Sequence, residues 1–196
     1  MDVNQDGWVD QIRISLPGEE VVWYENPGTK PGYWIMHPIL ANIGNESPAF
    51  VDIDGDGRED ILCNDPIAKE MIWLKSPSIK GDTTWPKFVI AAGDALGTGR
   101  YTHGLGWADM NKDGRKDVII IKGWWQCPAD PKQTNWVFHP ADLGENCSQT
   151  YTLTTLNNGL PDLISASANN YGIWWHRSNL LFKRLRKRFP LIQISN

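Results

Sequence analysis

Short apolar runs recur along the chain, and each ends at glycine, proline, asparagine or aspartate. In the second quarter of the chain, four such runs follow one another, at 49–54, 60–64, 70–76 and 87–92. These runs are short and rich in β-branched or aromatic side chains, which is typical of β-strands. No repeat contains a segment of about ten residues with the 3.6-residue period of a helix. The pattern therefore predicts an all-β chain.

The same motifs return at regular steps along the chain. Acidic segments of the form DVNQDGWVD align without gaps in three copies, with a degenerate fourth copy, and they begin at Asp2, Asp52, Asp109 and Thr154. A second series, W-x-x-x-P in its first three copies, begins at Trp23, Trp73, Trp124 and Trp174. A third series, W-x-x-H in its first and last copies, begins at Trp34, Trp85 and Trp136. The last two series advance by 50 or 51 residues at each step. The chain is therefore built from internal repeats of about fifty residues.

Four short strands in about fifty residues, repeated, match the size of one β-propeller blade. The expected fold is therefore a β-propeller, with about four blades of four antiparallel strands in this chain. We expect blades over residues 1–176 and a basic tail over 177–196. The tail contains FKRLRKR, which falls where the last strand of the fourth repeat should begin. It is a truncated or frame-shifted blade, a basic helix cap or a binding patch, and the sequence leaves these three open.

The chain contains eleven tryptophans. Eight stand at or beside a repeat marker: Trp23, Trp34, Trp73, Trp85, Trp124, Trp125, Trp136 and Trp174. In the main interpretation these rings pack between adjacent repeats, because each indole buries ~150–250 Å². In the alternative, the exposed members form a platform on which sugars stack.

The acidic segments follow the pattern D-x-[DN]-x-D-G-x-x-D, which places side-chain oxygens at alternate positions of a tight loop. Oxygen ligands without histidine or cysteine favour calcium. The glycine at the sixth position allows a sharp backbone reversal, and the seventh residue offers its backbone carbonyl. We therefore expect calcium in three loops. The candidate ligands are Asp2, Asn4, Asp6, Trp8 and Asp10, then Asp52, Asp54, Asp56, Arg58 and Asp60, and finally Asp109, Asn111, Asp113, Arg115 and Asp117.

Two other structures share these residue types. An EF-hand needs a bidentate glutamate at its twelfth position, where this chain has Arg13, Cys63 and Ile120, so an EF-hand is excluded. A solvated turn without an ion also uses aspartate, asparagine and glycine, but three aligned copies favour the metal. In the fourth loop no ion is expected, because the acids are replaced at Thr154, Leu156 and Asn158.

Together the acidic loops, the W-x-x-x-P hairpins and the W-x-x-H strands resemble FG-GAP or VCBS repeats. The resemblance covers Asp2 to about Trp175, and it implies a calcium-bearing β-propeller, commonly a ring of seven blades. The segments THGLGWADMNKDGRKD, KGWWQCPAD and NNGLPDLISASANNYGIWW further resemble the propeller of secreted bacterial proteins related to aldos-2-ulose dehydratase, a sugar lyase and isomerase. The chain departs from that second pattern at 169–170, where Asn-Asn replaces His-Asp.

The remaining composition agrees with a folded domain. The hydrophobic fraction is 41% and the net charge is −4, which argues against disorder. Cys63, Cys127 and Cys147 match no zinc spacing, and Cys127 with Cys147 is either a disulfide or a reduced buried pair. Polar and acidic residues follow Met1 at once, so we expect no secretory signal in this chain. The resemblance implies a secreted or periplasmic full-length parent.

Few residues suggest catalysis. His103 lies in the glycine-rich segment GTGRYTHGLG, where the backbone can approach a ligand closely, and a structural hydrogen bond is the alternative. His37 and His139 occupy one repeat position and are expected to be structural. No nucleophile–base arrangement or HExxH motif is present in the sequence. We therefore assign no catalytic residue, and whether the chain is an enzyme stays open.

Three functions fit these observations. The leading hypothesis is a calcium-binding scaffold or recognition module of an exported protein, with carbohydrate or another protein as partner. The second is the propeller part of a sugar dehydratase or lyase, with His103 near the chemistry. The third is an adhesion module like the integrin propeller. No nucleic-acid partner is expected, and no membrane span either, since no apolar stretch approaches about 18 residues.

Overall fold

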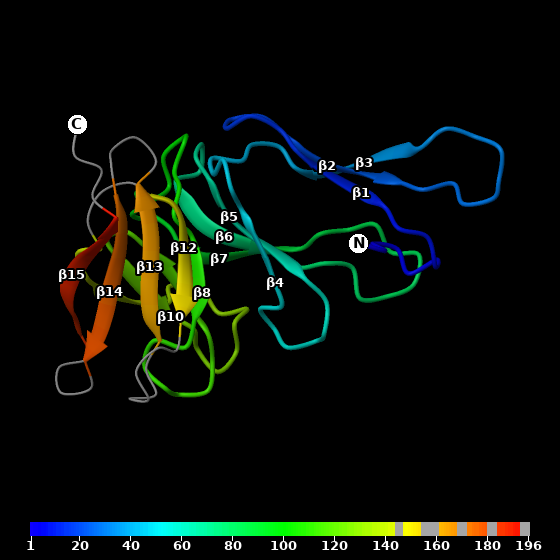
Figure 1. Cartoon of the computed structure of the whole chain (residues 1–196). Helices are drawn as coiled ribbons and strands as arrows, with labels where there is room; N and C mark the ends of the chain where they lie inside the picture. The colour runs from blue at the N-terminus through cyan, green and yellow to red at the C-terminus, as the bar shows by residue number, and fades with distance from the viewer. Residues whose placement is uncertain (144–146, 154–160, 168–171, 180–183, 193–196) are drawn as a thin grey trace. The chain divides into compact units, whose positions relative to one another are not determined.

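The computed structural model describes residues 1–143, 147–153, 161–167, 172–179 and 184–192. These residues form fifteen strands and no helix (Figure 1). The strands make four separate sheets, and the neighbours within each sheet are consecutive in the sequence. The expectation of an all-β chain is therefore confirmed. In the described part of the chain, no helix is long and apolar enough to cross a membrane.

The first sheet contains β1 (Gln11–Ile14), β2 (Val21–Glu25) and β3 (Ile35–Leu40). The second contains β4 (Ala49–Val51), β5 (Asp60–Asp65), β6 (Glu70–Leu74) and β7 (Lys87–Ala91). The third contains β8 (Gly106–Ala108), β9 (Asp117–Ile120), β10 (Gly123–Gln126) and β11 (Val137–Pro140). The fourth contains β12 (Cys147–Leu153), β13 (Asp162–Ser167), β14 (Ile173–Asn179) and β15 (Arg184–Ile192).

The second sheet contains all four runs that the sequence pattern predicted as strands. Residues 60–64 of β5 are buried without interruption, so this strand is covered on both faces. β5 pairs antiparallel with β6, from Ile61 opposite Leu74 to Asp65 opposite Glu70. β6 then pairs with β7, so that Trp73 lies opposite Phe88.

The first sheet has three strands where the other three sheets have four. Its strands β1, β2 and β3 correspond in sequence to β5, β6 and β7, and none of the described residues supplies a counterpart of β4 to this sheet. Four antiparallel sheets of this kind agree with a repeat of blade-like units. The number of blades in a ring, and the size of that ring, stay predictions.

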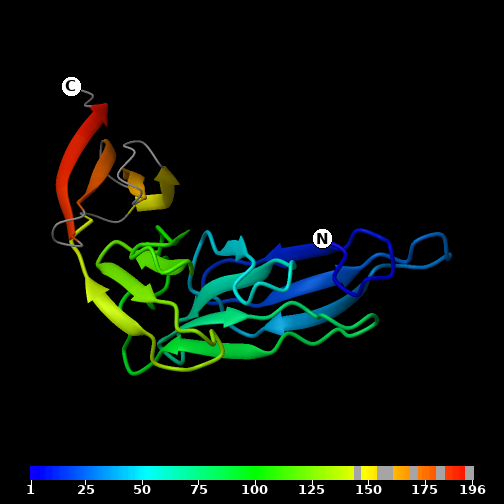
Figure 2. The ribbon, with the colours of Figure 1, turned by 90° about the horizontal axis from the view of Figure 1, so that it is seen from below.

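The chain divides into two compact units, Met1–Glu46 with Phe50–Tyr101, and Ser47–Ala49 with Thr102–Asn196. In the first unit one hydrophobic core joins the first and second sheets, whose strands can be followed by their blue to green colours in Figure 2. Val3, from the first acidic loop, belongs to this core together with Trp23 of β2 and Ile61 of β5. The second unit has its own core, with Ile119 of β9 packed in the same cluster as Leu163 of β13.

The predicted boundary at residue 177 falls within β14, which pairs along its length with β15. β15 begins at Arg184, and it has the place in the fourth sheet that β7 has in the second. The backbone of the tail therefore forms a strand over these residues. The assignment of 177–196 as a truncated or frame-shifted segment stays a prediction.

Most of the marker tryptophans are interior side chains. The buried ones are Trp23, Trp73, Trp85, Trp124, Trp125 and Trp136. Trp23 and Trp73 are fully buried, and Trp73 stacks on Phe88 with ring centroids 4.6 Å apart. Trp34 is an exception, because 46% of its surface is exposed. Trp23 and Trp85 lie in the core that the first and second sheets share, and Trp124 lies in a cluster with Leu163 of the fourth sheet. Packing between repeats is thus confirmed for these three rings and stays a prediction for the others, and sugar stacking is limited to exposed rings.

Replacing Trp73 by alanine should lower the free energy of unfolding by ~3–5 kcal/mol, because a fully buried ring leaves a cavity that the sheet cannot close. Urea denaturation followed by circular dichroism measures this change. The control is Tyr33→Ala, which removes a ring that is 95% exposed and should change stability by at most about 0.5 kcal/mol. Equal effects of the two substitutions would contradict the assigned packing.

Candidate metal centre

The three acidic loops share one backbone conformation. In each loop the fourth and sixth residues have positive φ angles, which lie in the left-handed region. The fourth residues are Gln5, Gly55 and Lys112. The sixth residues are Gly7, Gly57 and Gly114, with φ of 98°, 83° and 87°. An added Cβ at any of these three glycines would meet no atom within 4 Å, so the backbone conformation, and not a lack of space, favours glycine there. The predicted reversal at the sixth position is confirmed.

The first aspartate of each loop holds this conformation by accepting two backbone hydrogen bonds. Asp2 accepts from the N–H of Asp6 at 3.1 Å and from that of Gly7 at 3.0 Å. Asp52 and Asp109 accept the corresponding bonds at 2.9–3.2 Å. The carboxylate thereby satisfies two N–H groups that the turn cannot pair with other backbone groups.

The third and fifth positions add further bonds within the loop. The Oδ1 atom of the fifth residue accepts the N–H of the seventh at 2.8–2.9 Å, and these acceptors are Asp6, Asp56 and Asp113. Asn4 and Asn111 at the third position accept the N–H of the fifth residue at 3.1 and 3.0 Å. Such side-chain-to-backbone bonds are typical of Asx turns. The loops therefore keep their shape largely through their own polar groups.

The ninth aspartate joins each loop to the hairpin that follows it. It is at most 5% exposed in all three loops. One carboxylate oxygen accepts the N–H of the second residue of the loop, and the other accepts the N–H of the residue before the proline of W-x-x-x-P. For Asp60 these donors are Ile53 at 3.0 Å and Ser76 at 2.9 Å. The bonds at 2.8–2.9 Å to the other two come from Val3 and Asn26 for Asp10, and from Met110 and Cys127 for Asp117.

The degenerate fourth copy retains this ninth aspartate. Asp162 is fully buried and accepts a hydrogen bond from Trp175 Nε1 at 3.2 Å. The positions predicted to lack an ion, together with residues 169–170, lie outside the described residues. Because Asp162 is kept without the acidic positions that precede it, the ninth position has a structural role in addition to its predicted role as a ligand.

Burial raises the pKa of the ninth aspartates of the second and third loops. The value rises from 3.8 to about 6 for Asp60 and to about 7 for Asp117. The two backbone N–H groups that each carboxylate accepts act in the opposite direction, and the negative charges of neighbouring loop carboxylates add to the rise. A cation in the loop would favour the ionised form of both groups.

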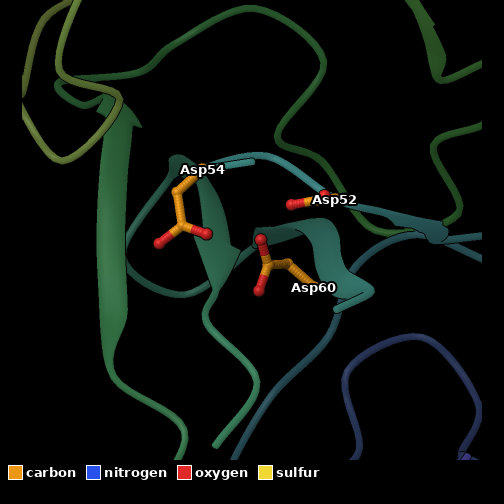
Figure 3. A group of neighbouring side chains, drawn as sticks. All are labelled: Asp52, Asp54 and Asp60. Carbon is orange, nitrogen blue, oxygen red and sulfur yellow. The ribbon is translucent and has the colours of Figure 1, made fainter. Parts of the chain in front are cut away.

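Three carboxylates of the second loop converge (Figure 3). Oxygens of Asp52, Asp54 and Asp60 all lie within 4.8 Å of one another, and this is the one such group of acids among the residues that the structure describes. Asp54 Oδ1 is buried and has no hydrogen-bond partner. A buried carboxylate oxygen is costly to leave unsatisfied, and a cation can satisfy it. A donor set made only of oxygen fits calcium.

One residue of the neighbouring hairpin faces each loop, and its charge differs between the repeats. This loop-facing hairpin residue stands two positions after the first tryptophan of W-x-x-x-P, and it is Glu25, Lys75 or Gln126. Glu25 accepts a bond from Asn4 Nδ2 at 3.2 Å, and Gln126 Nε2 donates to Asp113 at 3.1 Å. The sequence analysis missed this position because its residue type changes, although its spacing from the tryptophan is constant.

Lys75 brings a positive charge to the second loop. Its Nζ atom donates to Asp54 Oδ2 at 2.6 Å and also forms an ion pair with Asp56. Burial acts to lower the pKa of Lys75, but the bonds to the two carboxylates outweigh it and the pKa is raised. For Asp56 burial acts to raise the pKa, and the bonds from Lys75 and from the N–H of Arg58 lower it overall.

The side chains at the seventh position take different directions. Trp8 is 45% exposed. Arg58 donates to the carbonyl oxygens of the second and third residues of the chain, at 3.1 and 3.0 Å, and so links the second loop to the first. Arg115 donates to Asp113 Oδ2 at 2.6 Å. The role of the three backbone carbonyls as metal ligands stays a prediction.

The two equivalent histidines are part of the packing. His37 stacks on Trp23 and His139 on Trp124, with ring centroids 4.4 and 4.0 Å apart. Each histidine also forms a hydrogen bond with its loop-facing hairpin residue, at 2.9 and 3.1 Å. The structural role predicted for them is confirmed. His103 is half-buried and belongs to the chain segment that connects β7 to β8, and its participation in chemistry stays a prediction.

Two further sets of buried side chains belong to residues that the sequence left unexplained. Ser165 and His176, on adjacent strands, form a hydrogen bond of 2.8 Å and are 3% and 2% exposed, which fits a structural bond of the interior. Cys63 and Cys127 are buried free thiols, and burial raises the pKa of Cys127 to about 12. The structure does not describe the side chain of Cys147.

Comparison with known families gives one match. Residues 2–63 match the model of the FG-GAP-like repeat, and this span contains the first two acidic loops and the first W-x-x-x-P hairpin. Nothing matches the chain among the curated proteins or among the solved structures. The match supports an FG-GAP repeat family, whereas the similarity to aldos-2-ulose dehydratase stays a prediction.

Without calcium, the stability of the protein should fall as the pH rises from about 4 to about 7. A carboxyl group whose pKa is raised on folding binds its proton more tightly in the folded chain. Its contribution to stability is therefore complete below the unfolded-state pKa, and this contribution is lost as the pH rises through the folded-state pKa. Asp60 and Asp117 have this behaviour over the range from 3.8 to about 7. Thermal unfolding of the metal-stripped protein across this range measures the trend.

The variant Asp117→Asn isolates the contribution of that group. It cannot ionise, so the dependence of its stability on pH should be flatter than that of the wild type over the same range. An equally steep dependence in the variant would contradict the assignment of the raised pKa to Asp117.

Proposed function

We propose that this chain is a set of FG-GAP-like repeats, folded as β-propeller blades, whose acidic loops bind calcium. The observation that carries this proposal is the convergence of the carboxylates of Asp52, Asp54 and Asp60, together with the buried, unpartnered Oδ1 atom of Asp54. The first and third loops share the backbone conformation and the hydrogen bonds of the second, so the proposal extends to them. The family match over residues 2–63 supports it.

In each loop the ion would be held by side-chain oxygens of the first, third, fifth and ninth residues and by the seventh carbonyl. Calcium accepts six to eight oxygen ligands, so this set leaves places for water. The ion would offset the repulsion among the loop carboxylates. Because the ninth aspartate is bonded to the hairpin, an ion on the loop also strengthens the attachment of the loop to its sheet.

The biological role that we assign to the repeats is a scaffold or recognition module of an exported protein. Exposed aromatic side chains support recognition. Tyr33 and Trp34 are 95% and 46% exposed, and they are adjacent in the connection between β2 and β3. Aromatic rings with one wet face can stack on the apolar face of a sugar. Carbohydrate is therefore the ligand class that we propose.

Calcium should stabilise the protein, and EDTA should reverse the effect. At a calcium concentration of about 100 times the Kd, one site adds ~2.7 kcal/mol to the free energy of unfolding. Calorimetric titration of the metal-stripped protein gives the stoichiometry, and thermal unfolding gives the stabilisation. Asp54→Asn should remove or weaken one site, because it takes away the charge at the unpartnered oxygen.

The matched control is Glu59→Gln, which neutralises an exposed carboxylate at the eighth position of the same loop, outside the repeating pattern. This variant should bind calcium like the wild type. If calcium neither binds to the wild-type protein nor raises its unfolding temperature, the proposal fails.

For carbohydrate recognition, Tyr33→Ala and Trp34→Ala should each weaken binding on a glycan array by about two- to tenfold, since aromatic stacking contributes ~0.5–1.5 kcal/mol. Ile67→Ala is the control, because Ile67 is an apolar residue whose exposed fraction of 70% lies between those of Trp34 and Tyr33, and it lies outside the proposed surface. Sugar binding that survives both aromatic substitutions would exclude these two residues as the platform.

A further inference from the structure

We infer that Lys75 is a built-in counter-cation of the second loop, which holds the acids of this loop together without metal and weakens its affinity for calcium. The inference rests on the proposed calcium binding and deepens it, because it makes the three loops unequal. It concerns one side chain, the loop-facing hairpin residue of the second repeat.

The position of Lys75 is fixed by its surroundings. Its backbone N–H donates to the carbonyl of Pro86 at 2.9 Å, which places the residue at the end of the β6–β7 ladder. Its side chain is only 13% exposed and that of Asp54 only 10%. The ammonium bridges Asp54 Oδ2 and Asp56 Oδ2, and so joins the third and fifth positions of the loop, both of which are predicted calcium ligands.

The corresponding residues of the other repeats carry no positive charge. Glu25 adds a negative charge beside the first loop, through its bond with Asn4. Gln126 adds a neutral amide beside the third loop, through its bond with Asp113. Of the three loop-facing hairpin residues, Lys75 is therefore the one that carries a positive charge into its loop.

A second substitution accompanies the lysine. In the first and third repeats a histidine lies opposite the first tryptophan of the hairpin and bonds to the loop-facing hairpin residue. In the second repeat the same register position is occupied by Phe88, opposite Trp73. A phenyl ring stacks like the imidazole but accepts no hydrogen bond from Lys75. The ammonium is therefore directed to the loop carboxylates.

The two cations compete for the same charges. An ion bound by Asp54 and Asp56 would lie close to the ammonium, and like charges at short range repel most strongly where water is scarce. Calcium must then displace Lys75 or share its partners. The unpartnered Asp54 Oδ1 and the convergent carboxylates of Asp52 and Asp60 still offer oxygen ligands, so the second loop keeps a site that is weakened and not abolished.

The decisive variant is Lys75→Gln, because glutamine is the residue that the third repeat carries at this position. Calorimetric titration of the metal-stripped protein with calcium should show one binding event whose affinity rises by about tenfold or more, a change of ~1.4 kcal/mol per tenfold. The reciprocal variant Gln126→Lys should weaken one event by a similar factor. Lys75→Arg keeps the positive charge and should bind calcium like the wild type.

The matched control is Lys87→Gln. Lys87 is a lysine of the same sheet that pairs with Asp65 and Glu70 at 3.1 and 2.7 Å, away from the loop residues. Its loss should leave every calcium affinity unchanged. A rise in affinity in this control would mean that any lost positive charge suffices, and would overturn the specific role of Lys75.

A second measurement starts from the metal-free proteins. In the metal-stripped protein, Lys75→Gln should lower the unfolding temperature, since Asp54 and Asp56 lose their cation, and added calcium should restore more of it than in the wild type. An unchanged or higher unfolding temperature in the metal-free variant would overturn the inference.

The outcomes separate this inference from the proposed function. Calcium binding by the wild type with an identical titration of Lys75→Gln would overturn the inference and leave the proposed function standing. No binding by either protein would overturn both. Binding by the variant alone would overturn the proposed function, because the wild type would then bind no calcium, and would support the competition between Lys75 and the ion.

Discussion

The structure of each repeat depends on a buried carboxylate with two backbone donors. The ninth aspartate of the acidic loop accepts one N–H from the loop and one from the hairpin before its proline, and so it ties together two segments that are far apart in the repeat. A carboxylate can do this because it offers acceptor sites on both oxygens, whereas asparagine offers one oxygen only. Asp162 shows that the position survives even where the other acids are lost.

Some groups that shape or face the acidic loop are the same in its three copies, and one group differs. The first and fifth residues mainly satisfy the N–H groups of the turn, and the left-handed glycine closes it. These groups are the same in the three loops. The variable group is on the hairpin, where the side chains of Glu25, Lys75 and Gln126 set the charge that each loop meets. The backbone conformation of the loop is thus the same in the three repeats, whereas the charge of the hairpin residue beside it differs.

The sequence predicted the strands of the second repeat because each run is short, apolar and bounded by turn residues. It also predicted the turn at Gly57, since the left-handed conformation restricts the residue type. Asp60 was predicted as a metal ligand, but its bond to the hairpin was not, because the donor Ser76 is not brought near by spacing alone. Lys75 was missed for another reason: alignment of repeats draws attention to residues that stay the same, and this residue matters because it differs.

The contact made by Arg58 has a consequence for how the repeats of the first unit behave together. Its guanidinium leaves its own loop and donates to two carbonyl oxygens of the first loop, so part of the order of one repeat is supplied by the next. In repeat proteins, such interface terms make stability a sum over neighbours. Coupling of this kind is reciprocal. Whatever orders the second loop therefore lowers the free energy of ordering the first, and the two loops respond to their surroundings as a cooperative pair.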